Sequence, residues 1–153
     1  MAANYVPYTH GLGTATIYLI PLEYTEVAKT QALKEASDKI GAVIAPTSLV
    51  YFKIAEPSFI KLVTYLDIKE GYDRQTAQNV ITQRIRLYIN SIAPGDSLYV
   101  GELNKIGLNV EGVEYFSVVQ LFNNDEELPD FELLQTIQAK FMLDEIIWWE
   151  VDN

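Results

Sequence analysis

Few side chains in this sequence are of the types that catalysis or metal binding requires. His10 is the only histidine and cysteine is absent, which excludes histidine-based triads, thiolate nucleophiles and multi-histidine or thiolate metal sites built within this chain. We therefore interpret His10 as a residue without chemistry. Asp96 and Ser97 suggest a nucleophile with an acidic partner, yet both directly follow Pro94-Gly95, so a turn explains them. No catalytic residue, cofactor or metal is predicted.

A pair of glycines near the amino terminus resembles part of a dinucleotide-binding loop. That loop lies after a strand and before a helix, whereas Gly11-Leu12-Gly13 precedes the β-branched run that begins at Thr14. The two glycines are therefore predicted to form a turn or a flexible joint.

An acidic segment near the carboxy terminus has the residue types to supply oxygen ligands to calcium, or two carboxylates for acid-base work. Calcium-binding loops need ligands at set offsets and a sharp glycine turn, and the segment has neither. A solvated loop is the leading interpretation, and a contact with a protein partner or a bound ion are the alternatives. The carboxylates are Asp125, Glu126, Glu127, Asp130 and Glu132.

Aromatic side chains are the stronger functional signal. Ten tyrosines and two tryptophans are present, and aromatic residues are favoured anchors at interfaces, although core packing accounts for most of them. In a strand, Trp148 and Trp149 point to opposite faces, so one is predicted to be buried and the other exposed. The tail strand is also a candidate to add to the sheet edge of a neighbour. The interface candidates are Trp148, Trp149, Tyr51, Tyr99, Asp125, Glu126 and Glu127.

The net charge of −10 lies entirely in the last third of the chain. Residues 1–100 hold nine acidic and nine basic side chains, whereas residues 101–153 hold twelve acidic and two basic ones, Lys105 and Lys140. Such a surface repels a phosphate backbone, so nucleic acid is not an expected partner. A basic protein is the natural complement. Membrane is not an expected partner either, since no apolar run approaches the roughly 20 residues of a spanning helix.

A long amphipathic helix from Asp73 to Ile92 is the best-marked element. Asp73 suits its amino-terminal cap, and Pro94-Gly95 lies where a helix cannot continue. Apolar residues recur every three or four positions, which predicts that one face packs against a core. These residues are Ala77, Val80, Ile81, Ile85, Tyr88, Ile89 and Ile92.

The remaining elements predict an α+β fold with a ferredoxin-like βαββαβ sheet, helices on one face and a short carboxy-terminal β extension. Strands 48–54 and 59–68 are expected to pair as a hairpin around a short turn at 55–58. Thr25 is expected to cap the first helix. The other elements are a strand over 14–20, helices over 25–40 and 99–110, and a strand over 113–121. The side chains expected to point inward from these two helices are Val27, Leu33, Ala36, Ile40, Leu103, Ile106 and Leu108.

Several short motifs resemble, in matching order, the carboxy-terminal region of baseplate J-like proteins, which are inner wedge components of contractile phage tails and related injection machines. The resemblance covers about Gly11 to Leu121. Its motifs are Gly-Leu-Gly-Thr at 11–14, Ile-x-x-Gly-Tyr at 68–72, Tyr-Ile-Asn-Ser-Ile-Ala-Pro-Gly-Asp at 88–96, Val-Gly-Glu-Leu-Asn-Lys-Ile at 100–106 and Val-Glu-Gly-Val at 110–113. Family members are usually longer, with a preceding amino-terminal part, so this chain is expected either to be a separated domain or to share only the fold.

The resemblance implies a structural role without catalysis. Residues 1–13 are expected to be an arm or connector, residues 14–121 an α+β wedge-type domain, and residues 122–153 an acidic loop with two short strands, over 133–137 and 141–151. The expected partners are copies of itself, as a homo-oligomer, and other baseplate wedge proteins. The expected location is the tail baseplate of the virion, after assembly in the host cytoplasm. The alternative is a small ferredoxin-like regulatory or ligand-binding domain.

Overall fold

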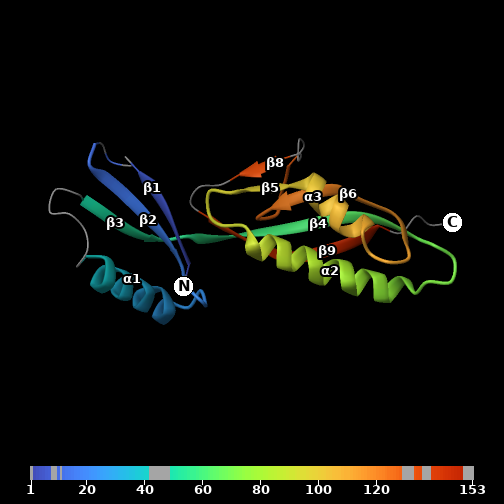
Figure 1. Ribbon diagram of the computed structural model, residues 1–153, viewed down its shortest axis with the longest axis horizontal. Coiled ribbons are helices and arrows are strands. Elements are labelled where there is room, and N and C mark those ends of the chain that lie inside the picture. Colours follow the sequence, from blue (N-terminus) through green and yellow to red (C-terminus); the bar gives the residue numbers. More distant parts are fainter. Residues whose placement is uncertain are drawn as a thin grey trace. The chain divides into compact units, whose positions relative to one another are not determined.

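The computed structural model describes residues 2–7, 10, 12–41, 49–128, 133–135 and 139–149. Over these residues the chain is α+β, with three helices and with strands in three sheets (Figure 1). The α+β class predicted from the sequence is confirmed. The chain forms two compact units. Of the described residues, the first unit takes those up to Glu56 with 93–95 and 139–140, and the second takes 57–92, 96–128, 133–135 and 141–149.

The first unit is a three-stranded sheet with one helix. Strand β2 (Thr14–Ile20) lies in the middle, antiparallel to β1 (Ala2–Pro7) and parallel to β3 (Leu49–Ile54). Helix α1 (Glu26–Gly41) connects β2 to β3. The segment expected to be an arm therefore contributes a strand, because the whole of β1 finds a partner along β2.

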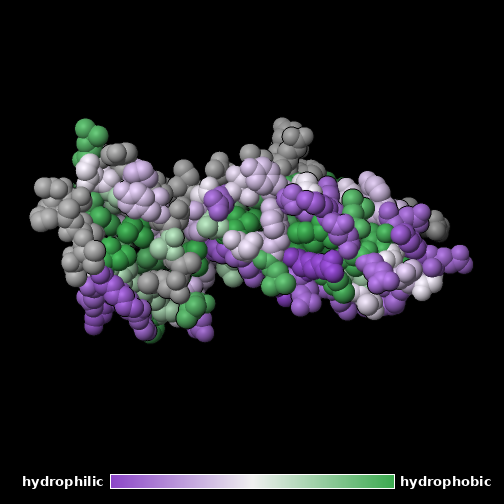
Figure 2. Space-filling model, in the orientation of Figure 1, coloured by the Kyte–Doolittle hydropathy of each residue, from purple (hydrophilic) through white to green (hydrophobic). Residues whose placement is uncertain are grey.

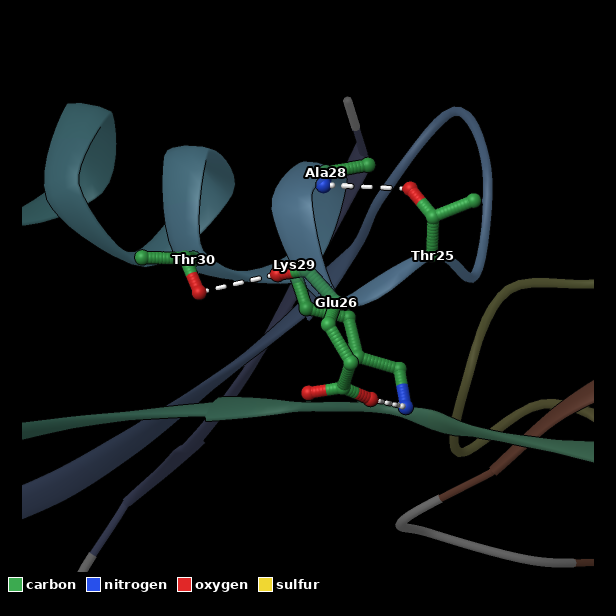
Figure 3. A network of polar contacts seen from close by, with 5 residues as sticks. All are labelled: Thr25, Glu26, Ala28, Lys29 and Thr30. Atoms are coloured by element: carbon green, nitrogen blue, oxygen red, sulfur yellow. Dashed lines mark hydrogen bonds and ion pairs between the residues drawn. The ribbon is translucent and has the colours of Figure 1, made fainter.

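The amino end of α1 is fixed by side chains, as predicted for Thr25 (Figure 3). The Ala28 backbone N–H donates to Thr25 Oγ1 at 3.2 Å, which gives an acceptor to one of the donors that a helix leaves open at its start. Lys29 Nζ pairs with Glu26 Oε1 at 3.2 Å, and Thr30 Oγ1 donates to the Glu26 carbonyl at 2.8 Å. The predicted cap is confirmed.

Two apolar residues predicted to point inward lie at the surface instead. Val27 is 77% exposed, because the side of α1 that packs on the sheet is centred on the small residues Ala32 and Ala36. Leu108 is 47% exposed, since it is the last residue of α3, whose packed side carries Val100 and Leu103. The spacing of apolar residues therefore predicted the wrong side of the helix for both Val27 and Leu108.

The second unit is organised around a four-stranded sheet in the order β7-β6-β4-β9. Strand β4 (Glu56–Ile68) pairs antiparallel with β6 (Val113–Asn123), which pairs antiparallel with the two-residue β7 (Glu126–Glu127). Strand β9 (Ala139–Trp149) lies on the other side of β4. A separate antiparallel pair is formed by β5 (Ser97–Tyr99) and β8 (Leu133–Gln135).

Helix α2 (Arg74–Ser91) confirms the best-marked prediction. Asp73 caps it by accepting a hydrogen bond from the Thr76 backbone N–H at 2.7 Å. Hydrogen bonds from the side chain and the backbone of Thr76 lower the pKa of the Asp73 carboxyl. The predicted apolar stripe is buried or partly buried along its whole length, from Ala77 to Ile92.

Helices α2 and α3 (Val100–Leu108) cover one face of the four-stranded sheet, and the side chains between them form the core. Gly107 of α3 lies directly against the ring of Phe116 on β6, so closely that a methyl group at Gly107 would overlap the ring. A second glycine, Gly112, has a φ of +81°, in the left-handed region, and its carbonyl accepts from the Lys69 N–H at 2.8 Å. Other core side chains include Ile60, Leu62, Leu66, Ile81, Ile85, Ile89 and Phe141.

The predicted hairpin of strands 48–54 and 59–68 is wrong, and with it the single βαββαβ sheet. Strand β3 belongs to the sheet of β1 and β2, whereas β4 belongs to the sheet of β6 and β9. No turn separates β3 from β4: only Ala55 lies between them, and its N–H donates to the Leu19 carbonyl at 2.8 Å, which extends the pairing with β2. The chain therefore passes from one sheet to the other without reversing.

Candidate interaction surface

The four-stranded sheet has one face that no described helix or strand of the second unit covers. On β4 the even-numbered residues from Ser58 to Leu66 are buried against the helices, so the odd-numbered ones lie on the opposite face, which we call the outer face. None of its described side chains is buried, and Phe59, Tyr115, Ile147 and Trp149 are between 41% and 52% exposed. The residues of the outer face are Phe59, Lys61, Val63, Tyr65, Asp67, Tyr115, Ser117, Gln120, Phe122, Glu127, Met142, Asp144, Glu145, Ile147 and Trp149.

Aromatic residues of neighbouring strands meet on the outer face. The ring centroids of Tyr65 and Tyr115 are 5.8 Å apart with planes tilted by 60°, a separation at which aromatic pairs attract each other. The pairing of β4 with β6 places Asp67 opposite Tyr115 and Lys61 opposite Phe122. The outer face therefore combines half-exposed rings with charged groups.

Strand β9 places the two tryptophans on opposite faces, as predicted. Trp148 packs against the core, with its ring centroid 6.4 Å from that of Phe116 in an edge-on contact, whereas Trp149 is 52% exposed on the outer face. The alternation shifts by one residue in the middle of β9, because the core-facing positions are 141 and 143 before the shift and 146 and 148 after it. Asp144 and Glu145 are both exposed as a result.

The acidic segment begins with a tight hairpin turn rather than an open loop. Asn124 and Asp125 have φ values of 50° and 65°, the conformation of a two-residue type I′ turn, between β6 and β7. The turn is attached to β4: Asn124 Oδ1 accepts from the Phe59 N–H and the Asn124 N–H donates to the Phe59 carbonyl, both at 2.9 Å. Ser58 Oγ and Asn123 Oδ1 also form a hydrogen bond. Residues 129–132, which complete the predicted segment, lie outside the described residues.

Lys61 on the outer face pairs with the carboxylate of Asp125. Lys61 Nζ lies 2.9 Å from Asp125 Oδ1. The hydrogen bond to Asp125 and its charge, followed by the charges of Asp144 and Glu145, raise the pKa of Lys61. Phe59, Lys61, Asn124, Asp125 and Asp144 line a shallow hollow of about 270 Å³ here. The local charge is negative despite the lysine.

The other predicted interface residues are exposed but lie at separate places. Glu126 and Glu127 are exposed, and Glu127 Oε1 accepts from Gln120 Nε2 at 2.9 Å. Tyr99, at the end of β5, is 51% exposed. Tyr51 belongs to the first unit, where its ring centroid lies 4.3 Å from that of His10. The second unit thus places Trp149 and Glu127 on the outer face, with Asp125 beside it at Lys61, whereas Trp148 is partly buried against the core.

Sequence reasoning missed the residues of β4 and β6 that supply most of the outer face. Phe59, Val63, Tyr65 and Tyr115 were not assigned to either face, because a strand rich in apolar residues on both sides resembles a fully buried one. The alternation of Lys61 and Asp67 with buried Leu62 and Leu66 was the available signal.

Within the described part of the chain, no group of three or more histidine, aspartate or glutamate side chains is arranged to hold a metal ion. None of the helices described is long and apolar enough to cross a membrane. No protein-family model matches the chain, and no curated protein matches it in sequence.

Proposed function

We propose that this chain is a non-catalytic assembly domain of a contractile-tail baseplate wedge, located in the virion, and that it acts by binding other proteins through the outer face. The observation that carries the proposal is the uncovered sheet face with four large apolar side chains at about half exposure. Apolar side chains exposed on one face and mixed with polar ones are typical of surfaces that bind other proteins. The choice of a baseplate wedge as the assembly is supported by the motifs between Gly11 and Leu121, which resemble those of baseplate J-like proteins in the same order.

The outer face has the composition of an interface rather than of a catalytic cleft. Trp149, Tyr115 and Phe59 are rigid aromatic side chains of the kind that anchor interfaces, and charged residues share the face with them. Fully burying a large apolar side chain contributes about 1.5–3 kcal/mol. Half-exposed side chains contribute roughly half of that, so Phe59, Tyr115, Ile147 and Trp149 together supply about 3–6 kcal/mol.

That sum is comparable to the cost of association, which is at least about 4 kcal/mol in lost rotational and translational freedom. Binding through this face alone is therefore weak. It becomes useful where several contacts act together, as they do between subunits of a large assembly, because the second contact forms at high effective concentration.

The proposal is tested by locating the chain in particles. A tagged version is expected to be recovered, in a fixed ratio to the other tail proteins, when intact contractile tails are purified and analysed by mass spectrometry. A Trp149→Ala variant is expected to be incorporated less, while Val27→Ala, a change of an exposed apolar residue in the first unit, serves as the matched control. Absence of the chain from the particles would refute the proposal.

A small ligand-binding domain is the second candidate. It is favoured by a hollow of about 320 Å³ beside α2, lined among others by Tyr72, Val80, Arg84 and Glu111. This volume is at the lower end of small-molecule pockets. A thermal-shift panel of metabolites and cations tests this candidate: a stabilisation that Arg84→Ala abolishes would support it, and a flat response would refute it.

A further inference from the structure

The two sides of the second unit carry opposite charge. Helix α2 contains three arginines, Arg74, Arg84 and Arg86, and no acidic residue. The four-stranded sheet on the other side of the core, with its β6–β7 turn, contains eight acidic and two basic residues. Helix α3 adds one acidic residue, Glu102, and one basic residue, Lys105, so the two helices together carry a net charge of +3, whereas the sheet with its turn carries −6 on the other side of the core.

The exposed side of α2, which we call the α2 face, is accessible and has an apolar element. All three arginines are exposed, and Leu87 is 64% exposed next to Arg86. Arg84 Nη1 donates to the Asn109 carbonyl at 3.2 Å, a bond that orients the guanidinium and leaves its charge in place. Figure 2 shows hydrophilic side chains interspersed with hydrophobic ones over the α2 part of the unit.

The outer face supplies the matching groups. Asp144 and Glu145 are adjacent and both exposed where the alternation of β9 shifts, and Asp67 and Glu127 lie on β4 and β7. Half-exposed rings such as Trp149 and Tyr115 lie on the same face, and an arginine guanidinium is attracted to both carboxylates and ring faces.

We propose that a second copy of this chain occupies the outer face, and that the contact is head-to-tail: the outer face of one copy binds the α2 face of the next. The inference rests on the proposed assembly function and names the partner and the surfaces. A symmetric contact of two outer faces would bring like charges together, which opposes association. In a head-to-tail pair, one outer face and one α2 face remain unbound. Further copies can bind there, so the assembly continues into a ring or a filament.

Pairing of β9 with a strand of another copy is the competing geometry for self-association. Strand β9 is at the edge of the sheet among the described strands. However, the adjacent charges of Asp144 and Glu145, at the point where the alternation of β9 shifts, are the kind of feature that blocks edge-to-edge pairing. The outer face is therefore a better surface for self-association than the β9 edge.

A charge-swap experiment tests the proposal. The sheet variant carries Asp144→Lys and Glu145→Lys, the helix variant carries Arg74→Glu and Arg86→Glu, and a control carries Glu23→Lys and Asp38→Lys in the first unit. The control has the same charge change as the sheet variant, at exposed positions before α1 and on α1. The mass of each protein in solution is measured by light scattering and sedimentation over a concentration series, in about 0.1 M and about 1 M salt. Interactions between charges are screened beyond about 10 Å in the lower salt and beyond about 3 Å in the higher salt.

The wild type and the control are expected to exceed the 17.3 kDa of one chain as concentration rises in low salt, and to approach that mass in high salt. Each charge-reversed variant alone is expected to associate at least tenfold more weakly. An equimolar mixture of the two is expected to regain association, because each then offers the other an oppositely charged surface.

Three results would overturn the head-to-tail contact: a wild type that stays monomeric throughout, single variants that associate like the wild type, or a mixture that stays monomeric. These failures are separate from failure of the proposed function. A chain that is recovered with tail particles but gives any of these results keeps its assembly role and loses only the self-contact.

Discussion

Gly107→Ala tests the packing of α3 on β6. In an open helix position this change stabilises by about 1 kcal/mol, because alanine has less backbone freedom to lose than glycine. At Gly107 the new methyl group would overlap the ring of Phe116, which is only 1% exposed and cannot move into solvent. Overpacking of a core costs about 1–3 kcal/mol. We expect the cost to exceed the helix gain, with a net loss of up to about 2 kcal/mol.

The same helix provides a matched control. A methyl group at Gly101 would have nothing within 4 Å, so Gly101→Ala is expected to be neutral or to stabilise by up to about 1 kcal/mol. The assay is urea unfolding followed by tryptophan fluorescence, since Trp148 contacts Phe116 and reports on this core. Phe116→Leu in the Gly107→Ala background should cost less than the sum of the two single changes. Equal or greater stability of Gly107→Ala would refute the packing argument.

Three further predictions concern the same unit. Gly112→Ala should destabilise it, by roughly 1–3 kcal/mol in urea unfolding, because Gly112 has φ +81° and its Cβ would overlap the Tyr72 ring. The lowered pKa of Asp73 means that its contribution to stability is present above the unfolded pKa of about 3.9 and is lost as pH falls through the folded value. Asp73→Asn, which retains an acceptor for the cap, should therefore lose less stability than the wild type between pH 7 and about pH 3 in urea unfolding; an equal loss would contradict this. Trp148→Ala should cost about 2 kcal/mol or more and Trp149→Ala less than about 1 kcal/mol, in urea unfolding followed by circular dichroism, and the reverse order would show that their faces are misassigned.

The elements with strong local signals were predictable from the sequence. Asp73, the spaced isoleucines and Pro94-Gly95 define α2 by interactions within a few residues, and the alternation around Trp148 correctly separates its face from that of Trp149. The separation of β3 from β4 was not predictable, because Ala55 and Pro57 are equally compatible with a turn and with an extended chain. The long-range partner, the carbonyl of Leu19, decides between them.

The candidate surface was partly predictable for a similar reason. Acidic residues and Trp149 were identified because charge and strand alternation are local properties. Phe59 and Tyr115 were not, because their exposure depends on which face of the sheet the helices cover, and that choice is made by the whole core. A sheet with apolar residues on both faces gives no local sign of which face remains open.

The position of β9 beside β4 has a consequence for the synthesis of the protein. Thr64 Oγ1 of β4 donates to the Ile147 carbonyl of β9 across 83 residues of sequence. At about 5–20 residues per second on the ribosome, β4 waits roughly 4–17 s for this partner. During that time one of its edges and the apolar side chains beside it have no β9 to cover them, and such edges recruit other strands. The four-stranded sheet is therefore completed only when β9 has emerged, and over this interval one edge of β4 stays open to other strands.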